Sequence, residues 1–160
     1  MRPQKVSSYI QRLDHLFKQV DHAAVGDIEL QAHWAKYLCV LVSGLIEVGV
    51  REMYGQFAKD RSAPEVANFV ARALGQFQNA KMNKILDLVG GFDPEWEEDL
   101  RTKTEGEVKD AVDSIVANRH IIAHGGQVGI TIASMTRYYE AVKTLISIME
   151  EQCDARAGRI

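Results

Sequence analysis

The fold is decided by residues 38–50, which read LCVLVSGLIEVGV. Apolar side chains occupy nearly every face of this stretch, so a helix formed by it has no side that belongs in water. The stretch lies inside a longer helical segment, expected from about Ile28 to Phe57, which follows the turn at Gly26 and takes Asp27 as its N-cap. We expect this segment to be the central helix, with the other helices packed around it.

Apolar residues at steps of three and four, the spacing of a helix that buries one face, recur on both sides of the central segment. They predict three further long helices, over about residues 4–24, 104–124 and 131–152. Two or three shorter helices are expected between residues 62 and 104, the first with Ser62 as its N-cap. Strand signals are weak, because no run alternates apolar and polar residues up to a tight turn. We therefore predict an all-α fold, a four-helix up-and-down bundle with short extra helices between the second pair of long helices.

The composition is that of an ordinary globular protein with one domain. The chain has 160 residues, of which 46% are apolar and 26% are charged, and this is enough for a sizeable core. We expect a single domain over residues 1–160, with its core at about 28–152 and a frayed tail at 153–160. The net charge of -3 provides no basic field for general nucleic acid binding, so a contact with RNA would have to be local.

Cysteine usage and hydropathy indicate the compartment. Cys39 and Cys153 are far apart in apolar helical contexts, which predicts free thiols of a reducing compartment rather than a disulfide. The N-terminus lacks the apolar core of a signal peptide. The longest apolar run, residues 37–50, is interrupted by Ser43, Glu47 and two glycines, so no membrane span is predicted. We expect a cytoplasmic protein with no membrane partner.

The chemistry of the chain concentrates in residues 117–126, which read ANRHIIAHGG. Arg119 carries a planar fork of donors that suits phosphate, and His124 exchanges a proton near neutral pH. Together these two side chains are a minimal kit for cleaving a phosphodiester without a metal. The alternative is that both are dipole partners or solvated groups at the end of a helix.

Helix geometry restricts how this pair can work. At about 100° per residue, positions 119 and 124 lie about 140° apart on a regular helix, whereas positions 120 and 124 share a face. The double glycine at 125–126 predicts that the helix ends here. The pair can then cooperate if the helix unwinds at its end, or if a two-fold dimer brings two copies of the motif together.

Two polar pairs raise other functions. His120 and His124 stand at i, i+4 and could hold a metal with a third ligand such as Glu47, but the residue after His120 is not the Glu of the zinc-protease motif. We therefore predict no metal site. Ser43 and Glu47 form an i, i+4 pair inside the apolar helix. Either Glu47 holds Arg119 or a His from behind, or the two are a packing Ser and an ordinary buried ion pair.

The chain resembles the HEPN superfamily in its motif Arg-His-x-x-x-His-Gly at residues 119–125, which comes late in a helical chain before one more amphipathic helix. Residues 41–47, LVSGLIE, resemble the helix of this family that bears an inward acidic residue. Residues 77–85, FQNAKMNKI, resemble the RiboL-PSP and MAE-type branches. The likeness extends over about residues 30–150.

This resemblance implies a homodimer that acts as a metal-independent endoribonuclease, a toxin or phage-defence effector that cleaves RNA at a cleft between its subunits. Arg119 would contact the scissile phosphate, and His124 would assist proton transfer. Supporting roles would fall to Asn118, His120, Glu47 and Ser43. The resemblance implies no cofactor and no metal, and the further partner would be an antitoxin or a defence-system protein. Because some members of the superfamily are inactive, the alternative is a non-catalytic dimerisation module that binds nucleotide, RNA or protein.

Overall fold

A computed structural model describes residues 1–23 and 25–155 of the chain, and over these residues it is built of seven helices without a strand. The helices are α1 (Gln4–Ala23), α2 (Ile28–Arg61), α3 (Pro64–Gly75), α4 (Met82–Gly90), α5 (Pro94–Thr104), α6 (Glu107–Ala123) and α7 (Ile132–Ala155). The prediction of an all-α fold is confirmed. The short helices α3, α4 and α5 lie in the chain between the second and the third long helix.

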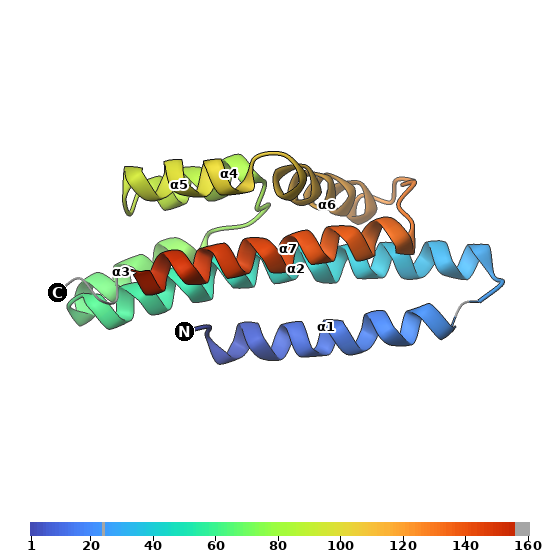
Figure 1. The fold of residues 1–160 in the computed structure, drawn as a ribbon, viewed down its shortest axis with the longest axis horizontal. Helices are drawn as coiled ribbons and strands as arrows, with labels where there is room; N and C mark the ends of the chain where they lie inside the picture. Colours follow the sequence, from blue (N-terminus) through green and yellow to red (C-terminus); the bar gives the residue numbers. More distant parts are fainter. Residues whose placement is uncertain (24, 156–160) are drawn as a thin grey trace.

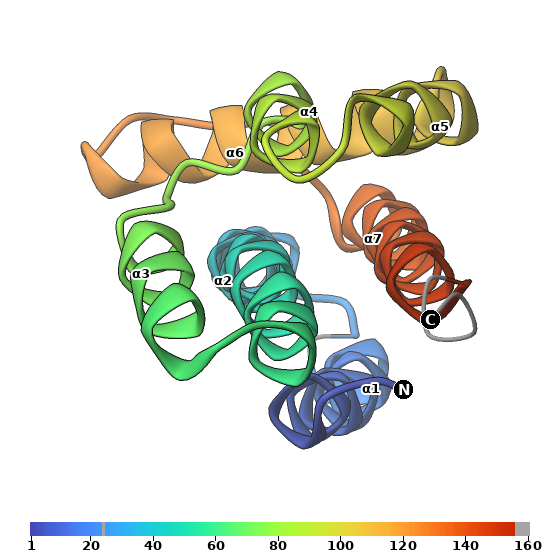
Figure 2. The same ribbon diagram turned by 90° about the vertical axis from the view of Figure 1, so that its left-hand side faces the viewer.

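The three longest helices run side by side along the long axis of the molecule, with α2 and α7 in one direction and α1 in the other (Figure 1). Helix α6 lies across them, because it is seen nearly end on in Figure 1 and lengthwise in Figure 2. It packs against both α2 and α7. The predicted up-and-down arrangement requires four aligned long helices. In the structure three of them are aligned, and α6 crosses the others.

The buried face of α6 is short, as expected for a helix that crosses its neighbours. Its buried residues, Ala111, Val112, Ile115 and Val116, occupy less than two turns of the helix. By contrast, the buried face of α7 extends from Met135 to Gln152. A helix that buries only a short stretch makes its contact at a crossing, whereas one that buries its whole length packs alongside its partner.

Helix α2 is the centre of the fold, as its apolar run predicts. It packs against α1, α3, α6 and α7. By length and composition alone, α2 is also long and apolar enough to cross a membrane, although its apolar run was predicted to be too short and too polar for a span. Half of its most apolar window is buried inside the protein. Contact with four helices accounts for the apolar character of α2, because little of its surface between Leu38 and Tyr54 faces water.

The core extends further toward the N-terminus than the predicted range of 28–152, and the last helix extends further toward the C-terminus. Helix α1 contributes five buried residues, Val6, Ile10, Leu13, Phe17 and Val20. The ring of Phe17 stacks on Tyr139 of α7 with ring centroids 4.6 Å apart. Helix α7 continues through Ala155, so residues 153–155 are helical rather than part of a frayed tail. Residues 156–160 of the predicted tail lie outside the described residues.

The two predicted helix starts have different outcomes. Asp27 is the N-cap of α2, and its carboxylate accepts a hydrogen bond from the backbone N–H of Leu30 at 3.0 Å. The prediction for Ser62 is wrong, because Ser62 is the C-cap of α2 and its hydroxyl donates to the carbonyl oxygen of Ala58 at 2.8 Å. With Pro64 as the first residue of α3, the N-cap position falls on Ala63.

Candidate functional site

The motif lies at the C-terminal end of α6, where the chain stops the helix with a Schellman motif. The N–H of Gly126 donates to the carbonyl of Ile121 at 2.9 Å, and the N–H of Gly125 donates to the carbonyl of Ile122 at 3.1 Å. Gly125 has φ +76°, the left-handed conformation that this motif needs and that glycine adopts without strain. His124 is the C-cap residue.

Gly126 is required for a different reason, which is close approach. A Cβ atom at this position would lie 2.5 Å from Cγ2 of Ile121 and 3.2 Å from its carbonyl oxygen. The double glycine therefore fixes a sharp helix end, as the sequence predicts. This end places His124 at the last helical turn.

The two histidines of the motif lie together. The rings of His120 and His124 have their centroids 4.6 Å apart, with the planes tilted by 59°. Both side chains are exposed at the end of α6. The prediction that His120 and His124 share one face of the helix is thus confirmed.

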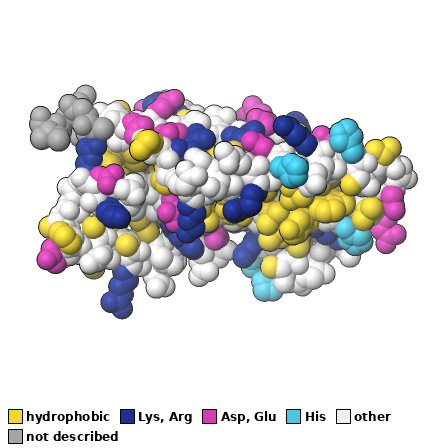
Figure 3. Space-filling view, turned by 90° about the horizontal axis from the view of Figure 1, so that it is seen from below, with side chains coloured by type: hydrophobic (Ala, Val, Ile, Leu, Met, Phe, Trp, Pro, Cys, Tyr) yellow, Lys and Arg dark blue, Asp and Glu magenta, His cyan; other side chains and the backbone are white. Residues whose placement is uncertain are grey.

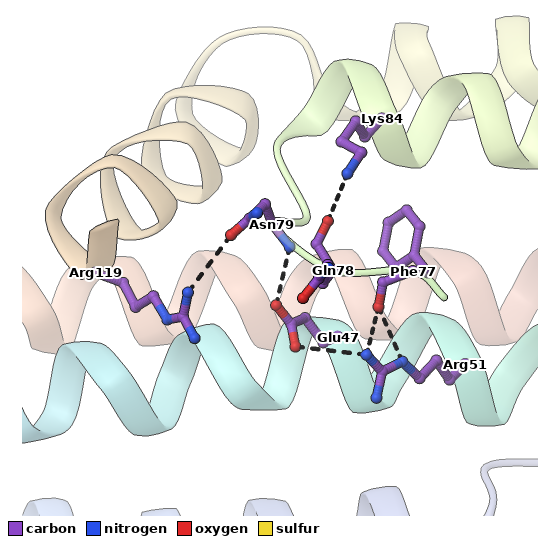
Figure 4. Close-up of polar contacts among 7 residues, drawn as sticks. All are labelled: Glu47, Arg51, Phe77, Gln78, Asn79, Lys84 and Arg119. Carbon is purple, nitrogen blue, oxygen red and sulfur yellow. Dashed lines mark hydrogen bonds and ion pairs between the residues drawn. The ribbon is translucent and has the colours of Figure 1, made fainter. Parts of the chain in front are cut away.

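Arg119 faces a different part of the molecule. Its side chain is half-buried, and its Nη1 donates to Oδ1 of Asn79 at 3.5 Å, across to the segment between α3 and α4 (Figure 4). In the described part of the chain the contacts of Arg119 and of His124 therefore go to different partners. The structure brings His120 to His124, but it does not bring Arg119 to His124 within one chain.

The segment that meets Arg119, residues 76–81, is held by side chains of α2. The backbone N–H of Asn79 donates to Oε1 of Glu47 at 3.0 Å, and the carbonyl oxygen of Phe77 accepts from Nε of Arg51 at 3.1 Å. Glu47 and Arg51 also pair with each other at 3.8 Å, one helical turn apart (Figure 4). Of the two interpretations of Glu47, the structure thus shows an ion pair with Arg51. The carboxylate reaches Arg119 only through Asn79.

The two remaining supporting residues, Asn118 and Ser43, are directed at the protein's own helices rather than at the candidate site. The amide of Asn118 donates to the carbonyl oxygen of Ser114 at 2.8 Å, one turn back in α6. Ser43 is buried, and it lies one helical turn after Cys39, whose thiol donates to the carbonyl oxygen of Ile115. Ser43 is therefore on the side of α2 that packs against α6.

The surroundings of Arg119 are locally basic, although the whole chain is acidic. Arg51 is half-buried and donates to the carbonyl of Phe77 in the same segment, and Lys81 and Lys84 are exposed at the start of α4. The Nζ of Lys84 donates to the carbonyl oxygen of Gln78 at 2.6 Å. Among the residues that the structure describes, no group of three or more His, Cys, Asp or Glu side chains is placed to hold a metal ion, so Glu47 does not join the two histidines. The site as built offers cations and imidazoles to an anionic ligand.

Sequence reasoning missed Asn79 and Arg51 as parts of this site. Asn79 stands in a polar break between two helices, Gln76-Phe77-Gln78-Asn79, which by itself predicts only a connection. Its distance of 40 residues from Arg119 gives no local pattern that joins the two. Only the packing of α6 across α2 brings them together.

A long all-α chain with an Arg-x4-His motif at the end of its penultimate helix has the features of a HEPN domain. The family model of RiboL-PSP-HEPN matches residues 5–155. The chain belongs to this family, and the resemblance stated from the sequence is confirmed. Searches of curated proteins and of solved structures returned no match.

Proposed function

We propose that this protein is a metal-independent endoribonuclease of the HEPN type, which cleaves RNA at a cleft between two subunits. The observation that carries the proposal is the end of α6, where the guanidinium of Arg119 and the exposed pair His120 and His124 stand within six residues on a structured helix end. Membership of the RiboL-PSP-HEPN family supports it, because many HEPN domains cleave RNA.

The chemistry follows from the properties of these side chains. The 2′-hydroxyl of the substrate attacks the adjacent phosphorus, and its proton passes to the neutral imidazole of His124. The bond from phosphorus to the 5′-oxygen breaks, and that oxygen leaves with a proton from a second, protonated imidazole. The products are a 2′,3′-cyclic phosphate and a 5′-hydroxyl. Arg119 stabilises the charge that develops on the phosphoryl oxygens, since its planar fork can donate two parallel hydrogen bonds.

The second subunit of the proposed homodimer has an apolar surface available to it. Large hydrophobic side chains are exposed along the first half of α2, with Ile28 at 83% and Tyr37 at 50% exposure, and Leu30 and Val40 lie between or beside them. Figure 3 shows a hydrophobic patch over this end of the molecule, with histidines around it. Soluble proteins leave few such patches uncovered.

This patch adjoins the candidate site. Val40 lies seven residues before Glu47, on the same face of α2 and two turns away. Glu47 in turn binds the segment that contacts Arg119. A second copy that uses the same patch across a two-fold axis would thus lie beside the segment that contacts Arg119. Tyr37→Glu should convert the dimer to a monomer in analytical ultracentrifugation and abolish cleavage, whereas Phe69→Glu, at an exposed apolar residue of α3, should leave a dimer.

The test is cleavage of end-labelled RNA by the purified protein in excess EDTA, beside Arg119→Ala and His124→Ala. Both variants should lose cleavage while the far-UV circular dichroism spectrum and the Tm are kept, because both side chains lie at the surface rather than in the core. Matched controls are Arg72→Ala on α3 and His15→Ala on α1, which remove the same chemical groups from exposed positions elsewhere. Activity that disappears with EDTA would contradict the proposal.

The second candidate is a non-catalytic module that binds nucleotide, RNA or protein. It is favoured by one observation, that Arg119 and His124 contact different partners within a chain. This candidate predicts a folded dimer that binds RNA, loses binding with Arg119→Ala, and leaves the RNA intact.

The proposed biological setting is that of a cytoplasmic toxin or phage-defence effector, with an antitoxin or defence-system protein as its partner. Overexpression should then arrest growth, and His124→Ala should relieve the arrest. His15→Ala should arrest growth as the wild type does, because its imidazole lies on α1. Arrest that persists in His124→Ala would count against a toxic nuclease.

A further inference from the structure

Asn79 has a backbone conformation that side chains other than glycine rarely adopt. Its φ is +54°, and it is the one non-glycine residue with positive φ in the described part of the chain. Asn tolerates this left-handed conformation better than most residues, at some cost in strain. Such a conformation persists only where the surrounding structure fixes it. We therefore consider which contacts fix Asn79.

Three consecutive residues of the segment are fixed by side chains from other elements. The carbonyl oxygen of Phe77 accepts from Arg51, the carbonyl oxygen of Gln78 accepts from Lys84, and the N–H of Asn79 donates to Glu47 (Figure 4). These bonds tie the segment to α2 on one side and to α4 on the other. The backbone of Asn79 is thus held, although its side chain is exposed.

The side chain of Asn79 is then directed at one target. Its Oδ1 accepts from Nη1 of Arg119, at a distance of 3.5 Å that is near the upper limit for a hydrogen bond. Hydrogen bonds of catalytic groups are often long without substrate and shorten in the complex. A guanidinium has five N–H donors, so four remain for a phosphate.

We infer that Asn79 is a positioning residue for Arg119. Its amide oxygen, carried on a backbone that Glu47 and Arg51 hold at Asn79 and Phe77, orients the guanidinium toward the bound phosphate. This inference rests on the proposed ribonuclease function and adds to the motif of α6 a group from the segment between α3 and α4. A fixed guanidinium loses less freedom when charge develops on the phosphate, so the effect belongs to turnover more than to binding.

The variants separate the amide from the backbone. Asn79→Gly removes the amide but keeps the N–H bonded to Glu47 and accepts the positive φ without strain. Asn79→Asp keeps a side chain of the same length with an oxygen acceptor, and it should therefore keep the function. Asn83→Ala, at an exposed Asn of α4 whose side chain accepts from the N–H of Lys84, is the matched control.

The first measurement is independent of activity. The ¹⁵N relaxation of the Arg119 Nε group reports how rigidly the guanidinium is held, and Arg119→Lys assigns the signal. In Asn79→Gly we expect a more mobile guanidinium, while Asn79→Asp and Asn83→Ala match the wild type. Unchanged mobility in Asn79→Gly would overturn the inference, even if the protein cleaves no RNA.

The second measurement is RNA cleavage. Asn79→Gly should lower kcat by about 10-fold with little change in KM, the effect of one lost hydrogen bond to a charged group. Its Tm should stay within about 2 °C of the wild-type value, because an exposed side chain is removed and strain is relieved. A kcat equal to that of the wild type would also overturn the inference, while the loss of cleavage in Arg119→Ala would still support the proposed function. If the wild type does not cleave RNA, the proposed function is contradicted. The mobility of the Arg119 guanidinium then decides whether Asn79 is a positioning residue.

Discussion

Replacing Gly125 by alanine should destabilise the protein, and the geometry of the helix end sets the amount. Gly125 has φ +76°, and a Cβ built at this position meets nothing within 4 Å. The cost is therefore conformational rather than steric. A left-handed conformation costs a residue with a side chain about 1–2 kcal/mol. The smaller conformational freedom of Ala in the unfolded chain returns about 0.4–1 kcal/mol.

The net destabilisation expected for Gly125→Ala is about 1 kcal/mol, and for a protein of this size that lowers the Tm by about 2–4 °C. Gly125→Asn should lose less, since Asn enters the left-handed region more readily. Gly75→Ala is the matched control. Gly75 is the last residue of α3, its φ is not positive, and a Cβ there also meets nothing within 4 Å. The same chemical change should stabilise the protein there by up to about 1 kcal/mol.

The assay is urea unfolding followed by far-UV circular dichroism, with the free energies compared at a common m-value. The order of stability should be Gly75→Ala, then wild type, then Gly125→Asn, then Gly125→Ala. If Gly125→Ala is as stable as the wild type, Gly125 is not left-handed and α6 does not end in a Schellman motif. The position of His124 as C-cap residue would then have lost its physical basis.

Two further predictions concern the core. Tyr54→Phe should cost about 1–2 kcal/mol in urea unfolding, because the buried Tyr54 hydroxyl donates to Oε1 of Gln152 at 3.1 Å and the variant leaves that oxygen without this donor; Tyr138→Phe, at a half-buried ring, is the control and should change little. Burial raises the pKa of Cys39 from 9.0 to about 11, so the folded thiol keeps its proton where the unfolded one loses it. Its contribution to stability is complete below pH 9 and falls as the pH rises toward 11, by up to about 1.4 kcal/mol per pH unit. Urea unfolding between pH 8 and 10 should show a smaller decline in Cys39→Ala than in the wild type, and equal declines would refute this assignment.

The parts of the fold that depend on local pattern could be predicted from the sequence. Residues 38–50 are apolar on nearly every face, and a helix of that kind has to be central. The double glycine predicts the end of α6, because one position needs a positive φ and the next has no room for a side chain. The contact between His120 and His124 follows from i, i+4 spacing alone.

The parts that depend on how helices cross could not be predicted in this way. Periodicity shows which face of α6 is buried, but it does not show whether that face packs along its neighbours or across them. The crossing brings Arg119 to Asn79, 40 residues earlier in the chain. The pairing of Glu47 with Arg51 is an i, i+4 contact within α2 and follows from local spacing. The second contact of Glu47, with the backbone N–H of Asn79, is set by tertiary packing.

The separation of Arg119 from His124 leads to a prediction about the proposed dimer. On one helix the two side chains point in different directions, and each has its own partner in the chain. If one cleft combines Arg119 of one subunit with the partner subunit's His124, a mixed dimer of Arg119→Ala with His124→Ala keeps one intact pair. Random exchange makes about half of the dimers mixed, so about a quarter of the wild-type activity should return when two inactive variants are mixed. If the pair acts within one chain, every subunit in the mixture lacks one member. Activity that stays at the level of the separate variants, with subunit exchange verified by mass spectrometry of the intact dimers, would then refute the shared cleft.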